Sequence, residues 1–266
     1  MSLVGARRSL LAGGLNREKF RRSLLVVLGD CRLLWLARQG DTTTSVSVET
    51  SSGRVITWDG DVSSRLTAFG GFGGAAQSFA VASSQYGDTP DTANLSFGNG
   101  TVDTPFSIIA LANVTDTAGL RTFVSKWDNT AREWIFRVGA TDLLQAVLTT
   151  SALNQDTLRT SDAAITQGSW RLFGMTYTAA TGGATAGDDI TLYQDGAVIA
   201  STATNNALYA AMSDKDSPAE IGSLIAHTLH FFDGSMALVA VTAKALTAAD
   251  HAAVAALCRR MFGVPL

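Results

Sequence analysis

Residues 190–200 read Ile-Thr-Leu-Tyr-Gln-Asp-Gly-Ala-Val-Ile-Ala, and this stretch decides the fold class. Apolar and polar side chains alternate from Ile190 to Gln194, as they do in a strand with one buried face. Asp195-Gly196 supplies the two positive-φ positions of a type I′ turn, and Ala197–Ser201 is expected to return as the partner strand. The sequence therefore predicts a β-hairpin here.

Short strand patterns broken by turn residues surround this hairpin. Spacing of this kind is typical of a β-sandwich rather than of alternating strands and helices. The other candidate strands are Leu95–Phe97, Phe106–Val114, Thr122–Lys126, Glu133–Val138, Leu143–Leu148, Trp170–Thr178, Glu220–Gly222 and Phe232–Val241. Trp170 and Tyr177 lie seven residues apart on one strand, so we expect them to point to opposite faces.

Both ends of the chain carry helical patterns. After Asn16, which can cap a helix, apolar residues recur at helical spacing as far as Cys31. Near the other end, Thr247-Ala-Ala-Asp250 approximates a capping box, and Gly263 is placed to end the helix. The only other cysteine, Cys258, falls in this second helix, and we expect two isolated buried thiols rather than a disulfide.

The net charge of −3 conceals an asymmetry. Residues 1–40 hold eight basic and two acidic residues (+6), whereas the remainder holds 12 basic and 21 acidic residues (−9). We therefore divide the chain into a basic helical arm for docking and assembly, residues 1–32, and a domain of residues 33–266. An ordinary solvated basic helix is the alternative. The expected docking residues are Arg7, Arg8, Arg17, Lys19, Arg21 and Arg22.

The same charge distribution limits the partners. Nucleic acid is not expected, because the domain is acidic and the basic residues are confined to the arm. No apolar run approaches the roughly 20 residues that a membrane-spanning helix needs, so membrane insertion is not expected. Arg7-Arg8 is followed by an apolar stretch too short for a secretion signal.

The strand landmarks also stand in a recognisable order. They are Leu95-Ser-Phe-Gly98, Phe106-Ser-Ile108, Phe123-Val-Ser-Lys126, Trp134-Ile-Phe-Arg-Val138, Gly168-Ser-Trp170, Met175-Thr-Tyr177, Leu192-Tyr-Gln-Asp-Gly196, Glu220-Ile-Gly222, Phe232-Asp-Gly234-Ser-Met-Ala237 and Lys244-Ala-Leu246-Thr-Ala-Ala-Asp250. In this order the run from about Leu95 to Val254 resembles the concanavalin A-like lectin/glucanase superfamily, in its laminin G-like branch. The resemblance implies a mainly β, two-sheet antiparallel jelly-roll sandwich, here with a basic helical N-terminal arm and a short C-terminal helix.

Some members of that superfamily are glycoside hydrolases, which need two carboxylates facing one another across a sugar bond. The Glu-x-Asp-x-x-Glu strand that carries them in the glucanases has no counterpart here. No Gly-x-Ser-x-Gly nucleophile elbow is present either. His227 and His230 lack a third ligand nearby in sequence and are expected to be surface imidazoles. We therefore expect a non-catalytic protein.

Two loops and one aromatic group remain as candidate binding features. Family members often hold calcium near the sheet rim, and the oxygen-rich loops Trp127–Asn129 and Ala186–Asp189 are candidates, although use as structural turns is favoured. No other cofactor is expected. For glycan contact the candidates are Trp127, Asp128 and Asn129, because an aromatic ring can stack on a sugar ring; Trp134 is expected to pack in the core.

These observations favour a structural or assembly role. Laminin G-like domains of this kind are common in bacteriophage virions, so the resemblance implies a tail, fibre or capsid-decorating protein assembled in the host cytoplasm. Its partners would be other copies of itself or other virion proteins. A carbohydrate-binding, lectin-like adhesion module that contacts a surface glycan is the alternative.

Overall fold

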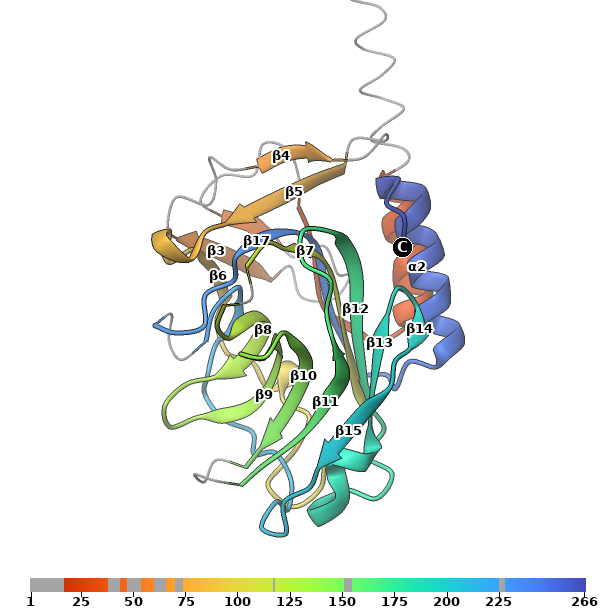
Figure 1. Cartoon of the computed structure of the whole chain (residues 1–266). Coiled ribbons are helices and arrows are strands. Elements are labelled where there is room, and N and C mark those ends of the chain that lie inside the picture. Colours follow the sequence, from red (N-terminus) through yellow and green to blue (C-terminus); the bar gives the residue numbers. More distant parts are fainter. Residues whose placement is uncertain are drawn as a thin grey trace, which may run out of the picture.

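The computed structural model describes residues 17–37, 44–46, 54–59, 66–69, 74–116, 118–150, 155–224 and 228–266. Two antiparallel β-sheets pack face to face, and helices lie on the outside of one of them (Figure 1). The mainly β, two-sheet jelly-roll sandwich with an N-terminal and a C-terminal helix is thus confirmed.

The first sheet has eight strands in the order β14-β13-β12-β7-β17-β5-β4, with β1 also paired to β17. Its strands are β1 Cys31–Leu36, β4 Leu66–Phe69, β5 Gly74–Phe79, β7 Phe106–Val114, β12 Trp170–Tyr177, β13 Ile190–Gln194, β14 Ala197–Val198 and β17 Gly234–Thr242.

The second sheet has nine strands in the order β15-β11-β10-β9-β8-β16-β6-β3-β2. Its strands are β2 Thr44–Val46, β3 Val55–Asp59, β6 Tyr86–Thr89, β8 Arg121–Trp127, β9 Arg132–Val138, β10 Leu143–Thr149, β11 Asp156–Ala164, β15 Ser201–Thr204 and β16 Ala219–Ile221. Short 3₁₀ helices, Val81–Ser83, Ala93–Leu95 and Gly183–Asp189, interrupt the connections.

The main core fills the space between the two sheets and is rich in aromatic rings. Phe123 stacks on Phe173 of the opposite sheet with ring centroids 5.1 Å apart, and Phe106 stacks on Phe97 at 4.3 Å. Tyr177 is fully buried in this core, whereas Trp170 lies half-buried against the helices on the other side of the same sheet. The predicted opposite orientation of these two side chains is therefore confirmed, as is the core position of Trp134.

A second apolar cluster covers the outer side of the eight-stranded sheet. The C-terminal helix α2, Ala248–Phe262, contributes Val254, Cys258 and Met261 to it. Residues 17–28 form a helix that runs beside α2 and buries Phe20, Leu24 and Leu28 in the same cluster (Figure 1). The N-terminal helix is therefore part of the packed domain, because its apolar stripe is covered by the sheet and by α2.

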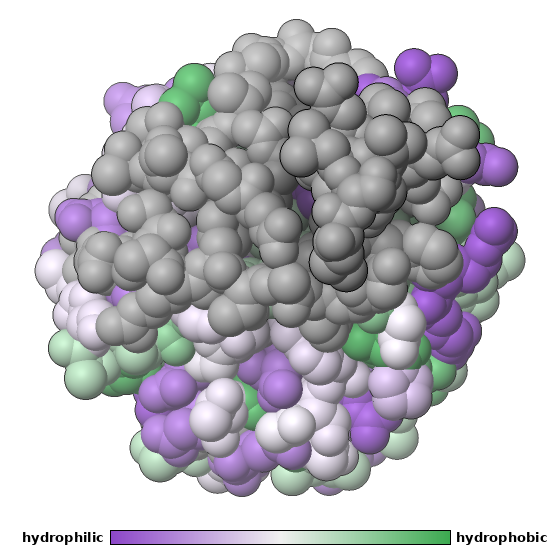
Figure 2. All heavy atoms as spheres, turned by 90° about the horizontal axis from the view of Figure 1, so that it is seen from above, coloured by the Kyte–Doolittle hydropathy of each residue, from purple (hydrophilic) through white to green (hydrophobic). Residues whose placement is uncertain are grey.

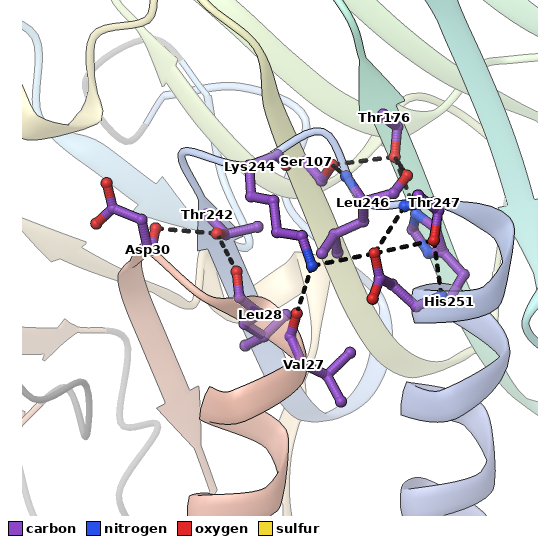
Figure 3. Close-up of polar contacts among 11 residues, drawn as sticks. Val27, Leu28, Asp30, Ser107, Thr176, Thr242, Lys244, Leu246, Thr247 and His251 are labelled. Atoms are coloured by element: carbon purple, nitrogen blue, oxygen red, sulfur yellow. Dashed lines mark hydrogen bonds and ion pairs between the residues drawn. The ribbon is translucent and has the colours of Figure 1, made fainter.

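Polar contacts hold the two helices to the ends of β7, β12 and β17 (Figure 3). Lys244 Nζ donates to the carbonyl of Val27 at 3.1 Å and forms an ion pair with Asp250 at 3.1 Å. The Thr242 hydroxyl contacts the carbonyl oxygens of Leu28 at 2.7 Å and Asp30 at 2.9 Å. The end of the N-terminal helix is thus tied directly to the segment that leads into α2.

The predicted punctuation of the C-terminal helix is confirmed. Thr247 and Asp250 form a capping box, and Gly263 ends the helix in the left-handed conformation. Cys258 and Cys31 are both buried free thiols, as expected. Cys31 is not helical, however. The N-terminal helix ends at residue 28, Gly29 turns the chain with φ of 69°, and Cys31 begins β1. The expected cap at Asn16 lies outside the described residues.

Other corrections concern strand ends. The hairpin turn has the expected positive φ angles, 55° at Asp195 and 86° at Gly196, but β14 stops at Val198 and the chain crosses to the other sheet as β15. The predicted strand Leu95–Phe97 is not a strand, because Leu95 ends a 3₁₀ helix and Ser96 and Phe97 follow it outside any regular element. The boundary placed between residues 32 and 33 falls inside β1, so it separates no structural unit. The docking role of residues 1–32 stays a prediction.

The described surface is chemically mixed. Seen from above, hydrophilic and hydrophobic residues alternate around the grey region (Figure 2). The exposed large apolar side chains are scattered over different elements: Val26, Val55, Val102, Val198, Leu208 and Leu229. Within the described ranges, no helix is long and apolar enough to cross a membrane.

Candidate functional site

The candidate site is the side of strands β8 to β11 that faces away from the core. An apolar floor crosses these strands, because Ile135, Val147 and Leu158 lie directly opposite one another in the β9-β10-β11 register. Trp127 from β8 and Leu224 complete this cluster, which is separate from the main core. We call this surface the β8–β11 face.

A row of polar side chains runs alongside the apolar floor. Thr122, Arg137, Gln145 and Thr160 are successive cross-strand partners from β8 to β11. Arg137 Nε donates to Gln145 Oε1 at 3.1 Å, and Gln145 Nε2 lies 3.4 Å from Thr160 Oγ1. Ile135, Val147 and Leu224 are buried beneath this row, whereas Leu158, Arg137, Gln145 and Thr160 are half-buried and form the accessible part of the face. An apolar patch with fixed donors and acceptors beside it is the composition expected of a small-ligand site.

Trp127 lies at one end of the apolar floor and is only 7% exposed. The Arg132 guanidinium stands over its ring, 5.6 Å from the centroid, and Arg132 also donates to the carbonyl of Asn129 at 3.1 Å. Such a cation–π contact holds the guanidinium beside the ring at the edge of the sheet. Among the residues predicted to contact a glycan, the structure thus places Trp127 on the floor of the face.

The other two predicted glycan residues form the turn between β8 and β9. Asp128 Oδ1 accepts from the amides of Thr130 at 2.6 Å and Ala131 at 2.5 Å. Partial burial acts to raise the pKa of Asp128, but these hydrogen bonds outweigh it and hold the pKa below its usual value. Asn129 is exposed at the tip of the turn. Asp128 therefore shapes the turn, and Asn129 remains free to contact a ligand at the rim.

A β-bulge places Trp127 on this face. Trp127 pairs with Arg132 and Lys126 pairs with Trp134, so Glu133 has no partner residue on β8. Lys126 and Glu133 are both fully buried and form an ion pair, and Lys126 Nζ also lies 2.8 Å from Asp91 Oδ1. Because neighbouring residues of a strand point to opposite sides, burial of Lys126 directs Trp127 outward.

Burial raises the pKa of Glu133 to about 7. The Lys126 ammonium, the Lys215 amide at 3.1 Å and the Ser96 hydroxyl at 3.1 Å oppose this shift. At neutral pH the Glu133 carboxyl group is therefore partly protonated and partly ionised.

His230 lies at the opposite end of the face from Trp127. Its carbonyl oxygen accepts from the amide of Thr122 at 3.0 Å, and its φ is 54°. Burial, followed by the charges of Arg137 and Arg121, lowers the pKa of His230 to about 4. The expectation of a surface imidazole is wrong for His230, which is half-buried, and His227 lies outside the described residues.

The two candidate calcium loops use their carboxylates in turns. Asp128 is engaged as described above, and Asp189 Oδ2 accepts from the amides of Thr181 at 2.7 Å and Gly182 at 2.8 Å. Asp188 accepts from the side chain of Asn205 at 2.7 Å. In the part of the chain that the structure describes, no group of three or more His, Cys, Asp or Glu side chains is arranged to hold a metal ion.

The predicted docking residues of the arm have different surroundings. Arg17 donates to the carbonyls of Ala37 and Leu36, both at 2.9 Å, and so anchors the helix to β1. Arg21 and Arg22 both form ion pairs with Glu18, which lies three and four residues before them on the same helix. Lys19 is exposed, and Arg7 and Arg8 lie outside the described residues.

Two side chains of the face, Arg132 and Arg137, were missed in the sequence, and His230 was assigned there only as a surface imidazole. A signal for Arg137 was present, because Glu133–Val138 alternates around apolar Trp134 and Phe136 and leaves Ile135 and Arg137 on the opposite side. No such signal existed for His230, whose position depends on the loop that returns to β8.

Comparisons with known proteins agree with the architecture. The family model described as the concanavalin A-like lectin/glucanases superfamily (Laminin_G_3) matches residues 81–250, more than half of the chain. No curated protein sequence matches the chain.

Solved structures with a similar fold include two binding domains. The binding domain of botulinum neurotoxin DC in complex with SialylT has a TM-score of 0.61 and 11% identity, over 87% of this chain and 52% of that chain. The binding domain of Paraclostridial Mosquitocidal Protein 1 has a TM-score of 0.57 and 12% identity, over 90% and 56%. The chain spans about half the length of these structures, and at such identities the likeness establishes the fold alone.

Proposed function

Because the chain belongs to the concanavalin A-like lectin/glucanases superfamily, we propose that it is a carbohydrate-binding module whose ligand lies on the β8–β11 face. The observation that carries this proposal is the arrangement of that face. The exposed edge of Trp127 and the half-buried Leu158 can pack against the apolar side of a sugar ring, while Arg132, Arg137 and Gln145 can bond its hydroxyl groups. The similar neurotoxin binding domain in complex with SialylT supports the same class of ligand.

A glycan array, probed with and without calcium, tests the proposal. We expect at least one class of oligosaccharide to bind, and titration calorimetry with that ligand then measures the affinity. Trp127→Ala should weaken binding by about tenfold or more, if a sugar ring gains from the indole about as much as the roughly 1–3 kcal/mol that a nucleic-acid base gains by stacking on an aromatic side chain. Trp127→Phe, which keeps an aromatic ring, should retain most of the affinity.

Trp170 provides the matched control. It is a half-buried tryptophan on the other sheet, beside the helices, so Trp170→Ala removes the same side chain far from the proposed site. Thermal melting of each variant separates loss of binding from loss of fold. If no glycan on the array binds, or if Trp127→Ala binds as tightly as the wild type, the proposal is wrong.

The proposed module binds its ligand without cleaving it. This part of the proposal is supported by the lack of a Glu-x-Asp-x-x-Glu strand in the sequence. Incubation of the protein with the labelled oligosaccharide that it binds, followed by chromatography, should return the ligand intact. Release of a shorter sugar would show that the protein is a hydrolase.

A structural role in a bacteriophage virion, with docking through the basic arm, is the second proposal. Its support is the outer side of the N-terminal helix, where Lys19 and Arg22 are exposed and Val26 is 82% exposed. Removal of residues 1–16 leaves the packed helix in place, and the mass of the particle in solution then reports assembly. A truncated protein that assembles like the full chain, and that keeps assembling after Lys19→Glu with Arg22→Glu, would remove this proposal.

A further inference from the structure

Arg137 lies on the β8–β11 face without an ion pair to any described residue. Within the described residues it donates a single hydrogen bond, from Nε to Gln145, and forms no ion pair. Burial lowers the pKa of Arg137, while the charge of Asp156 acts in the opposite direction. A guanidinium stays protonated in proteins, so its two terminal nitrogens are donors without an acceptor on the described chain.

Two further polar atoms beside Arg137 lack a partner. Thr122, its direct cross-strand partner, is fully buried, and its Oγ1 has no hydrogen bond. His230 Nδ1 is also buried without a partner, although the His230 backbone is bonded to Thr122. A buried polar atom without a hydrogen bond costs about 1–3 kcal/mol. Three neighbouring groups would therefore gain from an oxygen acceptor placed between them.

The charges around this point favour an anion. The positive charges of Arg137 and Arg121 both act on His230, and Arg121 is already paired with Asp116 at 3.1 Å. The acidic residues of the neighbouring strands β16 and β6, Glu220 and Asp88, lie in the row of Ser125 and Ile135 rather than in the row of Thr122 and Arg137. Asp156 is the acidic residue whose charge acts on Arg137, and it forms no ion pair with the guanidinium.

We propose that the glycan bound on the β8–β11 face carries a carboxylate or sulfate group, and that Arg137, Thr122 and His230 bind this anion. The proposal rests on the proposed carbohydrate-binding function and names its ligand class. A guanidinium binds a carboxylate or sulfate with two parallel hydrogen bonds, which a sugar hydroxyl cannot provide. The Thr122 hydroxyl and the His230 imidazole supply additional donors.

The length of the face indicates the size of the ligand. Arg132, beside Trp127, and Arg137 are five residues apart on β9, which corresponds to about 16 Å of strand. A monosaccharide cannot contact both ends. The ligand is therefore an oligosaccharide with its acidic group at Arg137 and a neutral ring toward Trp127.

Titration calorimetry with lactose, 3′-sialyllactose and 3′-sulfolactose tests the proposal and separates the two sources of the anion. The wild-type protein should bind at least one acidic trisaccharide or sulfated disaccharide about tenfold more tightly than lactose, as expected for a charge-assisted bidentate contact. Arg137→Met keeps the length and apolar stem of the side chain. It should abolish this preference, so that the acidic sugars bind no more tightly than lactose.

Two further variants keep the result interpretable. Arg159→Met is the matched control, because Arg159 is a half-buried arginine of β11 whose Nε is bonded to Ser201 at 2.9 Å. Thr122→Val removes only the unpartnered hydroxyl, so it should weaken binding of the acidic sugar severalfold without lowering the melting temperature. This variant tests the site even if Arg137→Met does not fold.

The outcomes distinguish the two levels of the proposal. If lactose and the acidic sugars bind equally, or if the preference survives in both Arg137→Met and Thr122→Val, the acidic ligand is wrong and the carbohydrate-binding function stands. If none of the sugars binds and the array is also negative, both are wrong.

Discussion

Replacement of Lys126 by methionine should destabilise the protein strongly. Lys126 and Glu133 are both 0% exposed, and the Lys126 ammonium contacts Glu133, Asp91 and the carbonyl oxygen of Lys215. Methionine fills a similar volume but leaves the Glu133 carboxyl group without its cation. Removal of one partner of a buried ion pair costs roughly 3–5 kcal/mol, and we expect a loss of this size in the free energy of unfolding at pH 7.

The pH dependence of that loss follows from the pKa of Glu133. In the wild type the folded pKa is about 7, above the ordinary value of 4.5, so the contribution of Glu133 to stability is complete below pH 4.5 and declines as the pH rises to 7. Without Lys126 the folded pKa moves higher, and the decline continues above pH 7. The stability gap between wild type and variant should therefore widen by about 1–2 kcal/mol from pH 7 to pH 8.5.

Urea denaturation followed by tryptophan fluorescence at pH 7 and pH 8.5 measures both quantities. The double variant Lys126→Met with Glu133→Gln should recover much of the lost stability, because replacement of both partners is often nearly neutral, and its gap should not change with pH. A loss below about 1 kcal/mol for Lys126→Met at pH 7 would refute the reasoning about the buried pair. So would a gap that is the same at both pH values.

Three further outcomes are expected. Gly234→Ala should destabilise the fold severely, because a β-carbon would lie 2.0 Å from the carbonyl oxygen of Asn113, whereas Gly168→Ala, with nothing within 4 Å, should cost only about 1 kcal/mol in urea denaturation. Burial lowers the pKa of His251 to about 4 from 6.5, so its contribution to stability is lost as the pH falls from 6.5 to 4. In His251→Gln the free energy of unfolding should therefore fall by roughly 3 kcal/mol less over this pH range than in the wild type. An unchanged dependence of stability on pH would contradict this assignment. Burial raises the pKa of Cys258 to about 12, so iodoacetamide should leave its thiol unmodified in the native protein and alkylate it in urea, as mass spectrometry will detect.

Elements with strong local signals were predictable residue by residue. Phe106–Val114 and Ile190–Gln194 match the expected strands at both ends, and Thr247 and Gly263 delimit the last helix as anticipated. In each case the signal is local: alternation of apolar side chains, a turn that requires positive φ, or a capping box.

Elements stabilised by their neighbours escaped prediction. β11 was not anticipated, because Asp156–Ala164 is rich in polar residues and carries little alternation. Its hydrogen bonds to β10 and β15 make it a strand, and those partners lie on both sides of it in the sheet. The assignment of Cys31 was wrong for the same reason, because pairing with β17 makes this apparent helical residue the first residue of a strand.

The amino-acid sequence by itself determined the sandwich, its family resemblance and one residue of the candidate site, Trp127. Only the tertiary structure decided which side chains share that site. The β-bulge at Glu133 turns Trp127 outward, and the cross-strand register brings Thr122 beside Arg137. Register and bulges are set by pairing between strands that are distant in sequence, and a shift of one residue would send each side chain to the opposite face of the sheet.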